Sequence, residues 1–220
     1  MYQPPHFRED NLEVQHALIR AHPLGLLVTL GGAGLVANPI PFALDGSAPP
    51  LGTLRAHLSR ANGQWQDFDP DVEALVVFQG PETYITPSWY AAKREHGKVV
   101  PTWNYAIVQA YGRMRVVDDP DWLLRQITAV TDVQEAARPE PWTVGDAPAP
   151  FVAAQLKGII GVEIEITRIE GKWKVSQNRS EADRQGVAAG LRLGQDDASR
   201  HMADLVDARG ALRGGGRSAS

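Results

Sequence analysis

Glycine and proline interrupt the apolar runs of this chain every few residues, which limits the folds that it can adopt. The 220 residues contain 21 glycines and 16 prolines, a density that suits many short strands and turns better than a helical bundle. Residues 24–30 form an apolar run of strand length, and residues 35–42 return after a glycine-rich turn. Because Pro39 and Pro41 cannot donate ladder hydrogen bonds, we expect the second run to be an edge strand or a bulge.

Short elements of both kinds are predicted along the rest of the chain. Strands are expected at 51–58, 73–78, 106–117, 159–169 and 172–178. Helices are expected at 10–22, 89–95, from 118–120 through about 130, and at 151–157, 180–190 and 198–208. Six or seven strands that never alternate strictly with helices predict a mainly β fold, an antiparallel barrel with peripheral helices, and argue against a doubly wound parallel sheet.

A single domain of residues 1–209 is predicted, followed by a disordered Gly/Ser/Arg tail at 210–220. Residues 79–104 are expected to form a long ordered excursion, because Pro81, Pro87, Gly97 and Pro101 punctuate them. No stretch approaches the roughly 18 apolar residues needed to span a bilayer, and the N-terminus lacks the pattern of a signal peptide. We therefore expect a cytoplasmic protein with no membrane partner.

Composition excludes several classes of chemistry. The chain has no cysteine, so disulfides, thiolate metal sites and cysteine nucleophiles are absent. It also lacks a phosphate-binding G-x-x-x-x-G-K-[ST] loop, a G-x-S-x-G elbow and closely spaced histidines. The net charge of −4 argues mildly against nucleic acid. Residues 90–115 and 167–192 nevertheless carry local charges of +4 and +3, so DNA remains a candidate partner.

The first of three polar clusters comprises His57, Ser59, Arg60 and Asn62, where a predicted strand ends. A guanidinium group, a hydroxyl and an amide so close together suit a phosphate, which Arg60 can bind through two charge-assisted hydrogen bonds. The alternative is a capped helix start with a surface arginine.

The other two clusters are aromatic and polar. Tyr84, Trp89, Tyr90, Trp103 and Tyr105 lie within 22 positions and suit a planar heteroaromatic ligand, or else a secondary core or a dimer interface. The third cluster ends the last predicted strand with three neutral polar residues, Ser176, Gln177 and Asn178. A solvated charged face explains Lys172 and Arg179 beside them more readily than it explains these three.

Several sequence blocks together resemble the PaiB family, the FMN-binding negative transcriptional regulators. The blocks are 34–42, 57–62, 78–81, 84–90, 98–105 and 173–179, and the resemblance covers about residues 1–195. It implies a six-stranded antiparallel split barrel of the kind shared with pyridoxamine phosphate oxidases and flavin reductases. It also implies a homodimer with the flavin site at the subunit interface. Gly63 and Gln109 depart from the family pattern, where a proline and a histidine are usual.

The resemblance assigns residues to an FMN site. Arg60 with Ser59, His57 and Asn62 would face the phosphate, Asn38 and Pro39 would line the flavin, and Gln79 would approach the ring or the ribityl chain. Trp103, Asn104, Ser176, Gln177 and Asn178 would close the site.

The predicted function is that of a negative transcriptional regulator or a flavin-dependent redox sensor. A flavin reductase or another flavin-dependent oxidoreductase is the first alternative, and a cofactor-free interaction protein is the second. No residue is assigned as a general acid or base, and no metal site is predicted.

Overall fold

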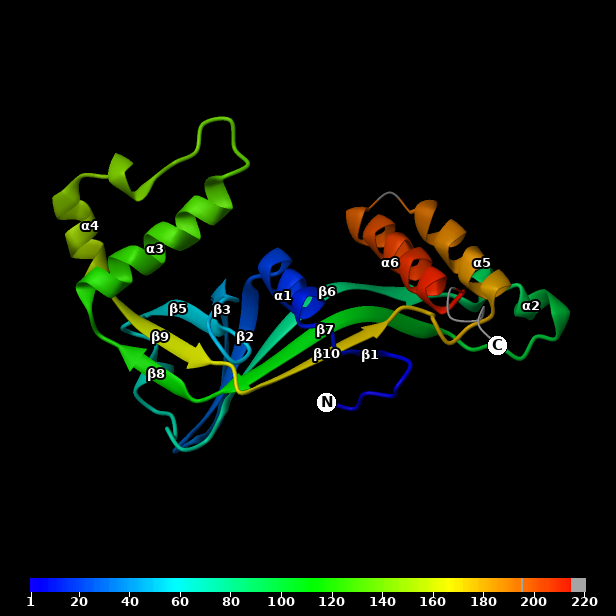
Figure 1. Ribbon diagram of the computed structural model, residues 1–220, viewed down its shortest axis with the longest axis horizontal. Coiled ribbons are helices and arrows are strands. Elements are labelled where there is room, and N and C mark those ends of the chain that lie inside the picture. Colours follow the sequence, from blue (N-terminus) through cyan, green and yellow to red (C-terminus); the bar gives the residue numbers. More distant parts are fainter. Residues whose placement is uncertain (195, 215–220) are drawn as a thin grey trace. The chain divides into compact units, whose positions relative to one another are not determined.

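The computed structural model describes residues 1–194 and 196–214 of the chain. Its strands are β1 (Arg8–Glu9), β2 (Leu24–Gly31), β3 (Gly34–Pro41), β4 (Ala43–Asp45), β5 (Thr53–Ser59), β6 (Ala74–Ile85), β7 (Thr102–Gly112), β8 (Met114–Val117), β9 (Ile159–Glu165) and β10 (Arg168–Lys174). One sheet has the order β1-β10-β7-β6-β2-β3 and the other the order β4-β5-β9-β8 (Figure 1). The predicted mainly β, antiparallel architecture is therefore confirmed.

The helices stand between the strands without regular alternation. They are α1 (Leu12–Ala21), α2 (Ala92–Glu95), α3 (Pro120–Glu135), α4 (Ala149–Leu156), α5 (Glu181–Arg192) and α6 (Asp197–Gly214), with 3-10 turns at Gly63–Trp65, Pro87–Trp89 and Val144–Asp146. None of the helices in the described part of the chain has the length and apolar character needed to cross a membrane.

The chain divides into two compact units. Unit 1 comprises Met1–Asn11, Gln79–Val108 and Gly171–Ser220, and unit 2 comprises Leu12–Phe78 and Gln109–Glu170. β6, β7 and β10 each contribute residues to both units. The single domain of residues 1–209 expected from the sequence stays a prediction.

The core of unit 2 lies on one face of β5. Leu54, Ala56 and Leu58 are at most 2% exposed, whereas Arg55 and His57 point to the opposite face, as the two-residue period of a strand requires. β9 pairs antiparallel with β5 and places Val162 opposite Ala56. Each fully buried aliphatic side chain stabilises such a core by about 1.5–3 kcal/mol. Helix α3 packs over β5 and β9 on the other face, so the side chains of Arg55 and His57 lie between the strand and this helix.

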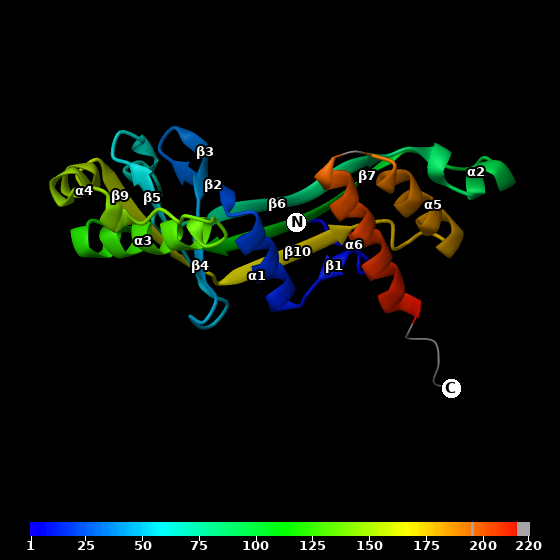
Figure 2. The ribbon, with the colours of Figure 1, turned by 90° about the horizontal axis from the view of Figure 1, so that it is seen from above.

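Unit 1 contains the helical pair α5 and α6, which lie side by side in Figure 1 and Figure 2. Val187 and Leu191 of α5 are buried, as are Met202 and Val206 of α6. The Ser180 side chain accepts a hydrogen bond from the Asp183 backbone N–H, which caps the start of α5. The Asp183 carboxylate, however, accepts from the Ala92 backbone N–H at 3.0 Å. The same carboxylate therefore joins α5 to α2.

Several predicted elements have other boundaries in the structure. The glycine turn joins β2 and β3 into a hairpin with Gly31 opposite Gly34, and β3 is an edge strand as expected. β6, however, continues to Ile85 into the expected excursion. The last two strands are separated at residues 166–167 instead of 170–171. Helix α6 extends to Gly214, beyond the predicted start of the tail, while residues 215–220 of that tail lie outside the described residues.

Candidate functional site

The first polar cluster of the sequence, called the phosphate cluster from here on, consists of His57, Ser59, Arg60 and Asn62. It spans the end of β5 and the tight loop before the 3-10 turn Gly63–Trp65. The Ser59 hydroxyl accepts a hydrogen bond from the Ala61 N–H at 3.2 Å, and the Asn62 side chain caps the turn by accepting from the Gln64 N–H at 3.0 Å. The Trp65 indole donates to the Arg60 carbonyl at 3.1 Å. These bonds fix the backbone on both sides of Arg60, so its guanidinium projects from a well-defined loop.

Arg60 forms a double hydrogen bond with Asp118, which lies just before α3. The Nη1–Oδ2 distance is 3.1 Å, and Nη2 also contacts Oδ1. The Arg60 side chain is 34% exposed and that of Asp118 is 60% exposed. The hydrogen bonds that Arg60 donates to Asp118 raise the pKa of Arg60 and lower the pKa of Asp118. Exposed ion pairs contribute little net stability, so an anionic ligand can replace this carboxylate.

His57 connects the phosphate cluster to α3. Its Nδ1 lies 2.8 Å from Oε1 of Gln126, and since that oxygen accepts, the Nδ1–H donates. Gln126 is 5% exposed, and its Nε2 has no hydrogen-bond partner among the described residues. A buried amide donor without a partner costs about 1–3 kcal/mol. It thus marks a place where a further acceptor can bind.

Asn38 and Pro39 lie on the edge strand β3. The Asn38 amide donates to Oε1 of Gln64 at 2.9 Å. Gln64 is 3% exposed and donates in turn to the Leu27 carbonyl at 3.1 Å and to the Thr29 hydroxyl at 3.1 Å. This network fixes β3 to the loop that holds Arg60. Sequence reasoning did not include Gln64 among the site residues, although it lies two positions after Asn62.

The predicted site residues of unit 1 fall into two groups. Gln79 and Asn178 are exposed, and Trp103 is 52% exposed with its ring edge-on to Tyr84 at a centroid distance of 6.1 Å. Asn104 and Ser176, in contrast, are buried and hydrogen-bonded to each other, with Nδ2–Oγ at 3.0 Å.

Gln177 is also buried, and it bonds locally. Its Oε1 accepts from the Val175 N–H at 2.7 Å, while its Nε2 donates to the Trp173 carbonyl. The polar atoms of the buried Asn104, Ser176 and Gln177 thus form hydrogen bonds within unit 1. Gln79, Trp103 and Asn178, in contrast, have exposed side chains.

Lys174 gives this part of unit 1 an unusual cation. Its ammonium donates to the Thr102 hydroxyl and to the Trp103 carbonyl, and it lies 5.9 Å from the centre of the Tyr105 ring. Burial lowers the pKa of Lys174, and the charges of Lys172 and Arg179 lower it further. The ammonium group of Lys174 therefore fixes the first residues of β7. Because its pKa is lowered, it gives up its proton more readily than an ordinary lysine.

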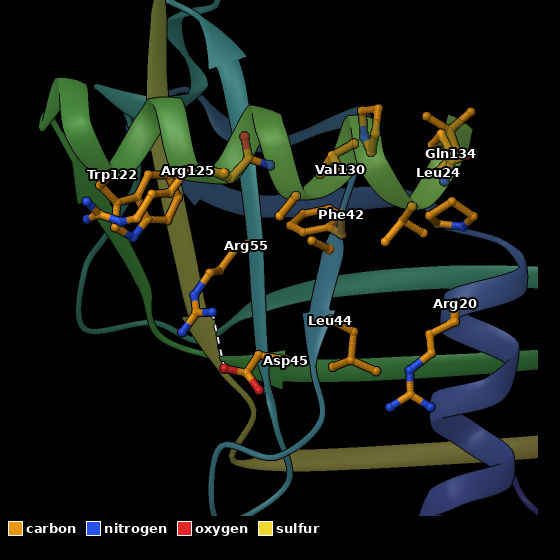
Figure 3. A pocket seen from close by; sticks show the side chains of 16 residues that line it. Arg20, Leu24, Phe42, Leu44, Asp45, Arg55, Trp122, Arg125, Val130 and Gln134 are labelled. Carbon is orange, nitrogen blue, oxygen red and sulfur yellow. Dashed lines mark hydrogen bonds and ion pairs between the residues drawn. The ribbon is translucent and has the colours of Figure 1, made fainter. Parts of the chain in front are cut away.

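A cavity of about 960 Å³ lies in unit 2, lined by α3, the end of α1 and β4 with its neighbours. Figure 3 shows Trp122 and Arg125 on α3, Arg55 with its guanidinium turned to Asp45, and Arg20 reaching in from α1. Gly161 leaves room for the Trp122 ring, since a Cβ there would lie 2.5 Å from Cζ3.

None of the predicted site residues lines this cavity, although His57 contacts its wall through Gln126. The sequence did contain a pattern that could have indicated this cavity. The α3 residues of the wall recur at helical spacing, and four of the seven are apolar while Arg125, Gln126 and Gln134 are polar. The seven residues are Trp122, Arg125, Gln126, Ala129, Val130, Val133 and Gln134.

The structure brings His57, Ser59, Arg60 and Asn62 together in unit 2, with Asn38 linked to them through Gln64. Pro39 also lies in unit 2, beside Asn38 on β3. The other predicted residues belong to unit 1, namely Gln79, Trp103, Asn104, Ser176, Gln177 and Asn178. No group of three or more His, Cys, Asp or Glu side chains suited to a metal ion occurs in the described ranges.

Solved structures share this architecture. The flavocytochrome Anf3 from Azotobacter vinelandii has a TM-score of 0.56 and 13% identity, over 76% of this chain and 69% of that one. The FAD and heme binding protein from Mycobacterium smegmatis has a TM-score of 0.52 and 16% identity, over 83% and 80%. At such identities the likeness shows the fold alone, which is the split barrel of flavin proteins.

Closer relatives identify the family. The family model described as "Putative FMN-binding domain" matches residues 1–168. The "Protease synthase and sporulation protein PAI 2" of Bacillus subtilis is 30% identical over 207 residues, 94% of this chain and 97% of its own. Protein AN0679 of Emericella nidulans is 35% identical over 250 residues, covering 97% and 99%. The chain belongs to the PaiB family of FMN-binding split-barrel proteins, as its sequence blocks predicted, and its cofactor is FMN.

The donor set of unit 2 fits the phosphate end of this cofactor. Arg60 offers a planar guanidinium with parallel N–H groups, which matches phosphate oxygens better than an ammonium does. The Ser59 hydroxyl is adjacent, and a Cβ added to Gly63 would have no atom within 4 Å, so there is open space beside the loop. When bound, FMN supplies the electron chemistry, and these are the residues that would bind and orient its phosphate.

Proposed function

We propose that this protein binds FMN through the loop after β5 and acts as a flavin-dependent redox sensor or negative regulator of transcription. The observation that carries the proposal is the position of Arg60. Its guanidinium projects from a loop fixed by Ser59, Asn62 and Trp65, and its partner Asp118 is an exposed carboxylate that a phosphate can displace. The regulatory role is the one that family membership suggests.

The other residues have supporting roles in this proposal. Asn38 and Pro39 line the flavin from the edge strand, and His57 stands beside the phosphate. Gln79, Trp103, Asn104, Ser176, Gln177 and Asn178 take part in closing the site. We further propose a homodimer with the flavin at the subunit interface, which light scattering tests directly through a mass twice the 24.0 kDa of one chain.

Titration of the purified protein with FMN tests the proposal through changes in the visible spectrum. The Arg60→Ala variant should bind FMN about ten- to hundredfold more weakly, because it loses a charged hydrogen-bond partner of the phosphate. Asp118→Asn should bind FMN more tightly than the wild type, because the amide competes less well than the carboxylate for the guanidinium.

Asp121→Asn provides a matched control for Asp118, since it changes an exposed carboxylate three residues away on α3. Its FMN affinity should equal that of the wild type. A wild-type protein that takes up no FMN would refute flavin binding, whereas unchanged affinity in Arg60→Ala would refute the phosphate assignment alone.

A flavin-dependent oxidoreductase is the alternative. It predicts steady consumption of a reduced nicotinamide cofactor by the FMN-loaded protein, whereas a sensor predicts at most one reduction per bound flavin. Stopped-flow and steady-state absorbance on the same sample separate the two functions.

A further inference from the structure

We propose that the cavity beneath α3 in unit 2 is a second ligand site, distinct from the flavin phosphate loop, which binds an organic anion with an apolar body. This inference does not depend on flavin binding. It rests on the chemistry of the cavity wall, on two arginines and on one buried amide.

The wall is apolar over most of its extent. Phe42 and Leu44 contribute from β4 and the residue before it, and Val130 and the Trp122 ring contribute from α3 (Figure 3). A cavity of about 960 Å³ lies within the range of about 300–1,000 Å³ that small-molecule sites occupy. Its size and lining suit a molecule with a ring system or a long alkyl chain.

The charges of the wall select an anion. The wall carries three guanidinium groups and one carboxylate. Arg55 is already bound to Asp45 at 3.1 Å and to Glu163 at 2.9 Å. The charge of Arg55 and that of Asp45 are therefore both compensated within the protein. Neither Arg20 nor Arg125 has a hydrogen-bond or ion-pair partner within residues 1–194 and 196–210, whose side chains the structure describes. Two cations thus remain for a ligand carboxylate or sulfonate.

The buried amide of Gln126 supplies a third recognition element. Gln126 lines the cavity and is 5% exposed, and its Nε2 has no partner among the described residues, while its Oε1 is held by His57 at 2.8 Å. Because His57 donates to the oxygen, the amide is oriented and its N–H groups are left for an acceptor. A ligand oxygen at this position would remove the cost of the unpaired donor.

The test uses 8-anilinonaphthalene-1-sulfonate, an aromatic anion whose fluorescence rises in apolar sites, with flavin-free protein. Saturable binding of one probe per chain is expected. The double variant Arg20→Gln/Arg125→Gln should bind it about tenfold more weakly, and Ala129→Trp, which fills the cavity from an exposed position, should abolish binding. The uncharged probe N-phenyl-1-naphthylamine should bind the wild type and the double variant alike.

Two matched controls are available. Arg113→Gln removes a surface arginine of the same unit that does not line the cavity, and Ala136→Trp adds the same ring just beyond the end of α3. Both should bind the sulfonate probe as the wild type does. Competition by decanoate and by 1-naphthoate then distinguishes an aliphatic from an aromatic natural ligand.

Three results would overturn the proposal. Equal sulfonate binding in the double variant would exclude recognition of charge by these arginines. If FMN displaces the probe from the wild type but not from Arg60→Ala, the cavity is part of the flavin site. The association of the protein is measured by light scattering. Loss of probe binding as the chains associate would mean that a second copy of the chain occupies the cavity. Failure of FMN to bind at all would refute only the proposed function.

Discussion

Glu163 lies on β9 between two guanidinium groups. Nε of Arg55 donates to Oε2 at 2.9 Å, and Nη2 of Arg115 donates to Oε1 at 2.6 Å. Burial by itself would raise the pKa of the Glu163 carboxyl, but the hydrogen bonds from Arg55 and Arg115 hold this pKa below its ordinary value of 4.5. A folded-state pKa below the unfolded one stabilises the fold above the unfolded pKa, and this stabilisation is lost as the pH falls through the folded pKa.

The Glu163→Gln variant should therefore lose about 1–3 kcal/mol of unfolding free energy at pH 7, because two charged donors lose their acceptor. The difference from the wild type should shrink once the pH falls below about 4.5. Urea unfolding at pH 7, 5 and 3.5 measures both effects. Asp71→Asn, which removes an exposed partner of Arg113, should change stability little. A difference that is constant with pH would contradict the account.

Ser176 has a positive φ of 65° although it is not glycine, and its hydroxyl is the partner of the buried Asn104 amide. Ser176→Ala should cost about 1–3 kcal/mol, because it keeps the unfavourable φ and leaves the amide unpaired. Ser176→Gly loses the same hydroxyl but adopts this φ freely, so it should be about 1 kcal/mol more stable than the alanine variant. Thermal unfolding of both variants measures the difference. Equal melting temperatures would show that the backbone is not strained.

The sequence could predict the phosphate cluster because its members are neighbours in the chain. Ser59, Arg60 and Asn62 share one loop, so a strand end brings them together whatever the rest of the fold does. The partner Asp118 could not be predicted, since 58 residues separate it from Arg60. The pairing of Asn104 with Ser176 spans 72 residues and depends on tertiary contacts that periodicity does not encode. FMN and the family were predicted from the combined blocks, while the individual site roles stay predictions.

At the scale of elements, α5 depends on two glycines that face Trp89. A Cβ on Gly186 would lie 2.0 Å from the Trp89 carbonyl oxygen, and a Cβ on Gly190 would lie 2.4 Å from atoms of the Trp89 ring. Such distances are shorter than any van der Waals contact. The close approach of α5 to the 3-10 turn Pro87–Trp89 is therefore possible only with hydrogen at these positions.

Gly190→Ala should consequently lower the unfolding free energy by about 1–3 kcal/mol, although alanine favours a helix over glycine by about 1 kcal/mol. The control Ala189→Gly changes the exposed neighbour and should cost about 0.5–1 kcal/mol through helix propensity alone. Chemical unfolding followed by tryptophan fluorescence measures both. A Gly190→Ala protein more stable than the wild type would mean that the helix can move away from Trp89.

Elements with local signals were predicted well. The β2–β3 hairpin follows from its glycine turn, and α3 begins where Asp119 caps it and Pro120 stands at its first position. The break between β9 and β10 was placed wrongly. Tertiary hydrogen bonds fix it, from the Ile166 N–H to the Gly52 carbonyl and from the Thr167 N–H to the Tyr111 carbonyl. The apolar run of residues 159–169 gives no sign of these distant partners.

At the scale of the whole molecule, the charge of −4 is unevenly divided. Unit 1 contains 13 Lys and Arg residues against 10 Asp and Glu, whereas unit 2 contains 9 against 16. The acidity of the chain therefore resides in unit 2. Direct contact with DNA, which the proposed regulatory role includes, should involve the basic unit 1.

Mobility shifts across a salt series test this expectation. Binding to promoter DNA should fall steeply with salt, and Lys93→Gln/Lys98→Gln should weaken it at every salt concentration. Lys157→Gln, an exposed lysine of unit 2, should leave it unchanged. The absence of any promoter-specific shift at low salt would exclude regulation through direct contact.

Gly161 has a consequence for how the cavity of unit 2 can change over generations. The glycine contributes no atom to the cavity wall, yet the Trp122 ring occupies the space that a side chain at position 161 would need. Any larger residue there would push the indole toward the cavity and shrink it. A single substitution at position 161 can thus alter the size of the ligand that fits, while every residue that lines the cavity stays the same.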